Sequence, residues 1–456
     1  MTFLLFIWIG LLAALVVWAI RKPGEGGTLT LAYFLVLSLI HVPGALIFVD
    51  PFAAVPGAGA SLVGFQMTVI GLTAFVSGAI LSRSWNRLPF ANTNSVQAVQ
   101  PKSFEGIGWT IFLTGVASYF VLLPLATLIP SLTSIVAALG TSIVVGLWLR
   151  LYGAALTGDR HRTLTTLAIL PLLPIATLVN GGFIGFGVCW AISAVAFLFV
   201  ITHRKRWFFV SAPFVIFFSL SLFVTYMGQR TGIRDLFWNQ HAGIVERLDR
   251  ISTLVTQFQV LDLADQDHIA ALNDRLNQNY FVGTGILRHE SGAVDLLHGA
   301  TVSPLALIPR AVWADKPAVG GGGDVVSLFT GISLSRTSSF GVGQVLEFYM
   351  DFGLPGVIGG FFILGFILRW LDFGIARALA AGNMRGFLTR SMIGVSMLQP
   401  GGNLVEVMVA VVASFLAANL LFTFVLMRRG QQGGAHMRDA AQFAPDPNRA
   451  YRSPNT

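Results

Sequence analysis

The chain has few charged residues and almost no cysteine for its length of 456 residues. Only 11% of its residues are charged, and Cys189 is its single cysteine, so no intramolecular disulfide can stabilise any part of it. Ordinary soluble domains carry about 25% charged residues, and the mean hydropathy here is +0.73. The two deficits exclude a disulfide-rich secreted scaffold and an ordinary soluble domain, and they indicate a chain that resides in a lipid bilayer.

Motifs for nucleotide, metal and serine-hydrolase chemistry are missing as well. The glycine run Gly320–Gly323 lacks the Lys-Ser/Thr pair of a phosphate-binding P-loop, and the chain has no G-x-S-x-G elbow. Residues 228–345 contain four histidines, His241, His268, His289 and His298, and no two of them stand at metal-ligand spacing. We therefore expect no metal and no cofactor, and any reaction must draw its energy from a substrate in the membrane.

Long apolar runs are what the sequence has in abundance. A helix of about 20 apolar residues crosses a hydrocarbon core of about 30 Å, and only helices satisfy every backbone group internally at these lengths. The pattern predicts an all-α polytopic membrane protein of about 11 transmembrane helices, at residues 2–20, 28–49, 61–81, 106–127, 131–149, 163–180, 183–201, 207–226, 352–371, 387–400 and 404–427.

Lys and Arg follow every second predicted span, as in Arg21-Lys22 after the first and Arg204-Lys205-Arg206 after the seventh. Basic residues in short loops stay on the cytoplasmic side, so we expect the N-terminus outside and the C-terminus in the cytoplasm. The basic pI of about 10.0 then reflects loops that face an anionic leaflet, and nucleic acid is excluded as a partner. The first span has no basic residue before it, which argues against a cleavable signal peptide.

Four regions follow from this layout. Residues 1–227 hold spans one to eight, 228–345 form one extracytoplasmic loop domain, 346–429 hold spans nine to eleven, and 430–456 have the composition of a disordered cytoplasmic tail. The loop carries nine basic and eleven acidic residues, unlike the basic cytoplasmic loops. Apolar residues at helical spacing from Ile244 to Phe258, and again over 265–276, predict amphipathic helices lying over the membrane face.

Two motifs stand at the end of this loop. Residues 308–317 read IPRAVWADKP, and residues 340–356 read FGVGQVLEFYMDFGLPG. Over roughly residues 275–365 the chain resembles the Wzy-like polymerases of bacterial O-antigen and exopolysaccharide repeat units. The resemblance implies a bundle of the GT-C-like membrane glycosyltransferase class, located in the bacterial inner membrane.

The implied reaction transfers a growing glycan from one polyprenyl diphosphate carrier to the terminal hydroxyl of another carrier-linked repeat, at the outer face. The implied substrate is an undecaprenyl-diphosphate-linked oligosaccharide, and the expected partners are a flippase and a chain-length regulator. The diphosphate supplies the driving force, so the enzyme is expected to be metal-independent.

Such chemistry needs a base for the acceptor hydroxyl and fixed positive charge for the departing diphosphate. Glu347 is the candidate base and Arg310 the candidate diphosphate ligand, and both are predicted to be catalytic. The other predicted substrate-binding residues are Lys316, Arg336, Arg275, Trp313, Tyr349 and Asp351. At the position of Asp351 the family is expected to have Asn as often as Asp.

Structural roles compete with each of these assignments. Glu347 could pair with Arg336 or Arg310 to fix the loop on the bundle, and Trp313 and Tyr349 could be anchors at the membrane interface. Glu406 could face the same outer cavity. At the level of function, the alternatives are an O-antigen-ligase-like glycan transferase, a lipid-linked glycan flippase, and a non-catalytic partner in an envelope-assembly complex.

Overall fold

The computed structural model describes residues 1–21, 25–49, 57–85, 101–126, 130–181, 184–202, 205–238, 243–299, 322–334 and 341–427, and every regular element in these ranges is a helix. The first half contains α1 (Thr2–Arg21), α2 (Thr28–Ile47), α3 (Ala58–Trp85), α4 (Pro101–Ala117), the π-helical turn η3 (Ser118–Leu122), α5 (Leu123–Ala126), α6 (Pro130–Gly140), α7 (Ser142–Thr157), α8 (Arg160–Ile169), α9 (Leu172–Gly181) and α10 (Gly185–Ile201). The second half contains α11 (Arg206–Trp238), α12 (Ile244–Thr256), α13 (Gln266–Leu276), α14 (Gln278–Glu290), α15 (Gly322–Thr330), α16 (Gln344–Ala380), α17 (Met384–Ser396), α18 (Leu404–Leu421) and the π-helical turn η5 (Phe422–Met427).

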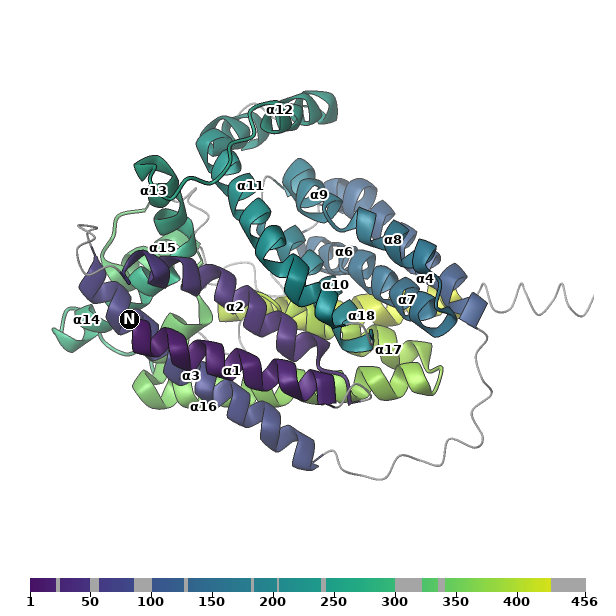
Figure 1. The fold of residues 1–456 in the computed structure, drawn as a ribbon, viewed down its shortest axis with the longest axis horizontal. Helices are drawn as coiled ribbons and strands as arrows, with labels where there is room; N and C mark the ends of the chain where they lie inside the picture. Colours follow the sequence, from purple (N-terminus) through teal and green to yellow (C-terminus); the bar gives the residue numbers. More distant parts are fainter. Residues whose placement is uncertain are drawn as a thin grey trace, which may run out of the picture.

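The two ends of the bundle in Figure 1 differ in the polar contacts that they contain. At what we call the loop end, α13 and α14 lie beside the C-terminal part of α2, and the His41 Nδ1 and Asn279 Oδ1 atoms are 2.6 Å apart. At what we call the basic end, Glu25 lies 3.1 Å from Arg83 and 3.4 Å from Arg369, joining the α1–α2 connection to α3 and α16. Helices α13, α14 and α15 of the predicted loop domain therefore lie together at the loop end, whereas α12 lies apart from them and packs on α11 and α9 (Figure 1).

The predicted count of eleven spans is not confirmed. Among the described residues, nine helical segments are long and apolar enough to cross a membrane. The predicted span 183–201 corresponds to α10, which is shorter at 17 residues, and the predicted span 387–400 corresponds to α17, which has 13. At 1.5 Å per residue, α17 alone covers about 20 Å of a core about 30 Å thick.

The segment that follows α17 explains why this span is weak in the sequence. Residues 397–403 are not helical, yet they continue from α17 to the loop end. There the backbone N–H of Gln344 donates to Pro400 O at 2.9 Å. Non-helical backbone in a membrane protein is tolerated when protein groups satisfy it, and Gln344 satisfies the carbonyls of Pro400 and Gln399.

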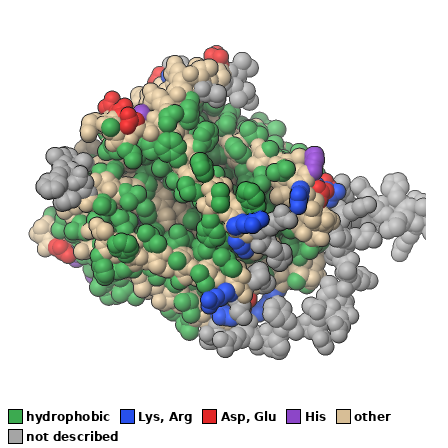
Figure 2. Space-filling view, viewed as in Figure 1, with side chains coloured by type: hydrophobic (Ala, Val, Ile, Leu, Met, Phe, Trp, Pro, Cys, Tyr) green, Lys and Arg blue, Asp and Glu red, His purple; other side chains and the backbone are tan. Residues whose placement is uncertain are grey.

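Surface composition agrees with a bilayer environment. In the face shown in Figure 2, hydrophobic side chains cover the middle of the molecule. Acidic residues lie at the left and top and also at the right, and most Lys and Arg lie toward the right and lower side. The N-terminal half of α11 is exposed around its circumference, with Phe209, Phe214 and Phe218 each more than half exposed. Such a surface is stable in lipid and not in water, so the chain is a multi-pass helical membrane protein.

Helix α3 packs through a row of glycines at every seventh residue. The row begins with Gly57, just before the helix, and continues with Gly64, Gly71 and Gly78. A β-carbon at Gly64 would lie 2.0 Å from the carbonyl oxygen of Asn279 on α14, and one at Gly78 would lie 2.0 Å from that of Phe362 on α16. The backbones therefore touch, as in other membrane helix pairs that associate through small residues. The glycine row fixes α14 and α16 on the same helix and so positions the candidate site.

The predicted amphipathic helices of the loop are confirmed as helices. The stretch from Ile244 forms α12, and the stretch 265–276 forms α13, whose N-terminus is capped by the Asp265 carboxylate. Helix α13 packs on α2 and α11. Leu261, Leu272 and Leu276 form a small apolar cluster with Val224 of α11.

Candidate functional site

Glu347, the candidate base, lies in the first turn of α16 at the loop end and is only 2% exposed. Its Oε2 accepts the backbone N–H of Leu404, the first residue of α18, at 2.6 Å. The first N–H groups of a helix have no partner within it and favour a carboxylate. Asn403, the N-cap residue of α18, makes no capping bond of its own, so Glu347 caps α18 from a neighbouring helix.

Gln344 completes this contact between α16 and the segment before α18. It is fully buried; the Tyr33 hydroxyl donates to its Oε1 at 2.6 Å, and its Nε2 donates to Gln399 O at 3.1 Å. A β-carbon at Gly341 would lie 1.8 Å from Gly401 O, so two backbones touch beside it. Both ends of the Gln344 amide are thus engaged, as buried amides require.

The FG pair of the motif breaks α16. Phe352 and Gly353 have non-helical dihedrals, and Gly353 (φ 65°, ψ −152°) occupies a region open essentially to glycine alone. The break frees the Met350 carbonyl, which accepts the N–H of Leu297 at 2.7 Å. The motif therefore encodes a short helix, residues 344–351, that carries Glu347 and is set off from the apolar remainder of α16.

Tyr349 and Asp351 share this short helix with Glu347. Asp351 is fully buried, and Tyr349 is 7% exposed with its ring centroid 5.9 Å from that of His289. The carboxylates of Asp351 and Glu406 are close enough to Glu347 to interact with it electrostatically. Glu406, in the first turn of α18, is the exposed member of the three. No group of three or more His, Cys, Asp or Glu in the described ranges could hold a metal ion.

Of the other predicted site residues, the structure describes only Arg275. Arg310, Trp313, Lys316 and Arg336 lie outside the described residues, so the predicted pairing of Glu347 with Arg310 or Arg336 stays a prediction. Arg275 is half-buried in the last turn of α13. The structure thus brings together Glu347, Tyr349 and Asp351, and it places Arg275 on a helix that packs against α2 and α11.

Helix α14 contributes polar groups that sequence reasoning missed. The Asn279 side chain donates to the carbonyl of His41 at 2.8 Å, and the Asn277 side chain donates to Ser61 at 3.1 Å. Arg288, farther along α14, lies against Gly331, and its buried Nε has no hydrogen-bond partner within the described part of the chain. The run Asn277-Gln278-Asn279 between apolar residues was the available signal for buried amides.

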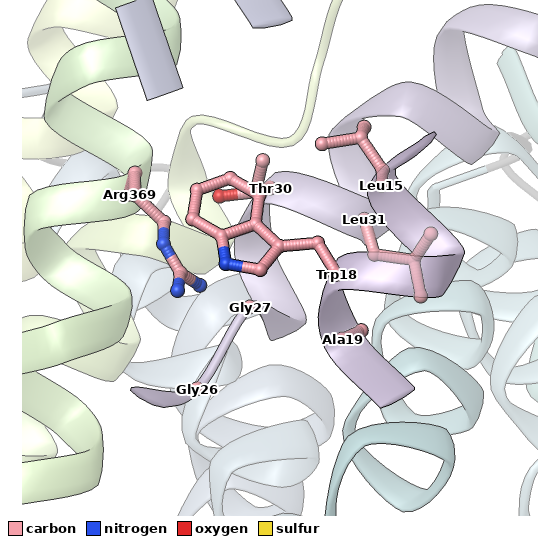
Figure 3. A pocket seen from close by; sticks show the side chains of 8 residues that line it. All are labelled: Leu15, Trp18, Ala19, Gly26, Gly27, Thr30, Leu31 and Arg369. Atoms are coloured by element: carbon pink, nitrogen blue, oxygen red, sulfur yellow. The ribbon is translucent and has the colours of Figure 1, made fainter. Parts of the chain in front are cut away.

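A second polar constellation lies at the basic end (Figure 3). Asp372 accepts the N–H groups of Leu29 and Thr30 at 2.8 and 3.0 Å and so caps α2. The Arg369 guanidinium points toward Trp18, whose ring centroid is 4.2 Å away. The hollow beside them measures about 10 Å³, room for about one water molecule. This constellation therefore anchors helices and offers no space for a substrate.

No family model, curated protein or solved structure matches the chain. Its own residues define its class: a multi-pass helical membrane protein in which one end of the bundle holds the buried carboxylates of Glu347 and Asp351, and the other holds Arg83 and Arg369 paired with Glu25.

Proposed function

We propose that the chain is a membrane glycosyltransferase that joins polyprenyl-diphosphate-linked oligosaccharide repeats into a long polysaccharide at the outer face of a bacterial inner membrane. The observation that carries the proposal is the position of Glu347. It lies buried at the loop end, on the short helix 344–351, downstream of residues 308–317 in the sequence, and the carboxylates of Asp351 and Glu406 interact with it electrostatically. A carboxylate in such a place is costly to keep.

The proposed reaction is a displacement at the anomeric carbon of the donor glycan. The acceptor hydroxyl oxygen forms the new glycosidic bond, and the bond from the anomeric carbon to the phosphate oxygen breaks. The diphosphate departs with the electron pair of that bond, and the hydroxyl proton passes to a protein base. The base and the cationic ligands are the parts that the protein must supply.

Within the proposal, Arg310, Lys316, Arg336 and Arg275 are the candidate diphosphate ligands, and Arg288 joins them because its Nε is buried without a partner among the described residues. Arginine can bind two phosphate oxygens at once, and loss of such a donor costs about 3 kcal/mol in the transition state. Trp313 and Tyr349 are candidate platforms for sugar rings. Glu347 is the candidate base.

The test is the size distribution of lipid-linked and surface glycan in cells that carry wild-type protein, a deletion, Arg310→Ala, or the control Arg385→Ala at matched membrane abundance. Arg385 is an exposed arginine at the basic end that bonds the side chain of Asn419. We expect single repeats to accumulate on the outer leaflet in the deletion and in Arg310→Ala, and normal polymer in the control.

Other results would point elsewhere. Long polymer retained on the carrier would assign the chain to ligation, and repeats trapped on the inner leaflet would assign it to flipping. Normal polymer in Arg310→Ala together with loss in the deletion would remove Arg310 from the site, and normal polymer in both would refute the proposed function.

A further inference from the structure

A second candidate binding site lies at the basic end, where α16 turns into α17. A cavity of about 240 Å³ opens there, lined by Trp370, Gly374, Arg377, Asn383 and Arg390 together with small alanines. It is far larger than the 10–15 Å³ or so that one water molecule needs. Two of the lining side chains are cationic and none is acidic, so the cavity favours an anion.

The fold holds one arginine across the cavity by means of a glycine. A β-carbon at Gly374 would lie 2.3 Å from both Cδ and Nε of Arg390, so any larger residue there would displace the guanidinium. Arg390 Nη1 donates to Gly386 O at 3.2 Å, which occupies one of the five N–H donors of the group. The remaining donors form the fork that matches phosphate oxygens.

Asn383 adds an uncharged N–H donor to the cavity. Its Oδ1 accepts the N–H of Gly386 at 2.9 Å and caps α17, so the part of its amide left for a ligand is the NH₂ group. Arg377 lies three residues after Gly374 on α16, which places both on one face of the helix. The cavity therefore combines two guanidinium groups with one amide donor.

We propose that this cavity binds a phosphate group. Trp370 is 47% exposed beside it, and tryptophan at a membrane interface lies at headgroup level. Basic pockets between membrane helices bind the phosphates of anionic lipids. A soluble phosphate ester offers the same chemistry. The site is distinct from the loop end, where the proposed glycan chemistry takes place, so it stands or falls independently of that function.

The experiment measures binding to the purified full-length chain in detergent, by native mass spectrometry and by the midpoint of thermal unfolding. The probes are phosphatidylglycerol, phosphatidylcholine and inorganic phosphate. The double variant Arg377→Gln/Arg390→Gln removes both cations, and Arg385→Gln makes the same kind of charge change on α17 outside the cavity. Gly374→Ala retains every charge and displaces Arg390 alone, which keeps the test open if the double variant folds poorly.

We expect phosphatidylglycerol to bind and stabilise the wild-type chain more than phosphatidylcholine does. Its apparent affinity should fall roughly tenfold or more in the double variant, as loss of charge-assisted hydrogen bonds predicts, fall less in Gly374→Ala, and stay unchanged in Arg385→Gln. If inorganic phosphate raises the unfolding midpoint of the wild type as much as phosphatidylglycerol does, the bound phosphate group belongs to a soluble molecule. Equal losses in Arg385→Gln and the double variant, or no response to either anionic probe, would overturn the proposal.

Discussion

Glu347 has two physical roles that a single substitution can separate. Its carboxylate accepts the N–H of Leu404 and so holds the start of α18 in place, and under the proposed function it also receives the acceptor proton. Glutamine can accept the same N–H bond through its amide oxygen, but it cannot act as a base. Alanine removes both abilities.

We therefore expect Glu347→Gln to retain folding and to lower polymerisation by about 10²- to 10⁴-fold, the usual contribution of a general base. Glu347→Ala should in addition destabilise the protein by about 1–3 kcal/mol, because the Leu404 N–H is left buried without a partner. Initial rates on lipid-linked repeats and thermal unfolding midpoints measure the two effects. Wild-type activity in Glu347→Gln would reduce Glu347 to a positioning residue, and a matched Glu406→Gln variant would then show whether the exposed carboxylate is the base.

At the scale of elements, the candidate site depends on how closely α14 approaches α3. A β-carbon at Gly283 of α14 would lie 1.7 Å from the carbonyl oxygen of Ala60 on α3. No rotamer change can relieve a contact with backbone, so the helices would have to move apart. A β-carbon at Gly59, also on α3, would meet no heavy atom of another element within 4 Å.

Gly283→Ala is expected to cost about 1–3 kcal/mol through overpacking and to loosen α14 on the bundle. Gly59→Ala is its matched control, and it should be neutral or slightly stabilising because alanine favours the helix. Thermal unfolding midpoints and protease sensitivity of α14 report the difference. Equal behaviour of the two variants would contradict the close backbone packing of α14 on α3.

At the scale of the whole molecule, the two ends of the bundle are expected to face opposite sides of the membrane. Helices α13, α14 and α15 lie at one end, and the contacts of Glu25 with Arg83 and Arg369 lie at the other (Figure 1). The distribution of Lys and Arg along the sequence predicts that the basic end faces the cytoplasm. The single cysteine makes this orientation directly accessible to labelling.

In a Cys189→Ala background, Ala264→Cys reports on the loop end and Ala380→Cys on the basic end, since both alanines are exposed. We expect a membrane-impermeant maleimide to label Ala264→Cys in cells whose inner membrane is intact, and Ala380→Cys only after that membrane is permeabilised. The reverse pattern would invert the topology and would move the proposed reaction to the wrong side of the membrane.

Boundaries within the membrane were harder to predict than the helices themselves. The span predicted at 352–371 belongs to α16, which the structure extends from Gln344 to Ala380. Glu347 and Asp351 lower the hydropathy before residue 352, and Arg369 and Asp372 lower it near residue 371. All four are buried, since neighbouring helices supply partners such as Leu404 N–H, Glu25 and the start of α2.

The sequence by itself determined the membrane class, most of the helices and the separation of basic loops from an acidic segment, because hydropathy and charge act locally along the chain. Only the tertiary structure decided that Glu347 caps α18, that α3 binds α14 and α16 through a row of glycines, and that Arg377 and Arg390 share a cavity. The first two join residues far apart in the chain, and the third depends on how α17 folds back on α16. Whether a buried polar group is tolerated depends on partners that no local pattern names.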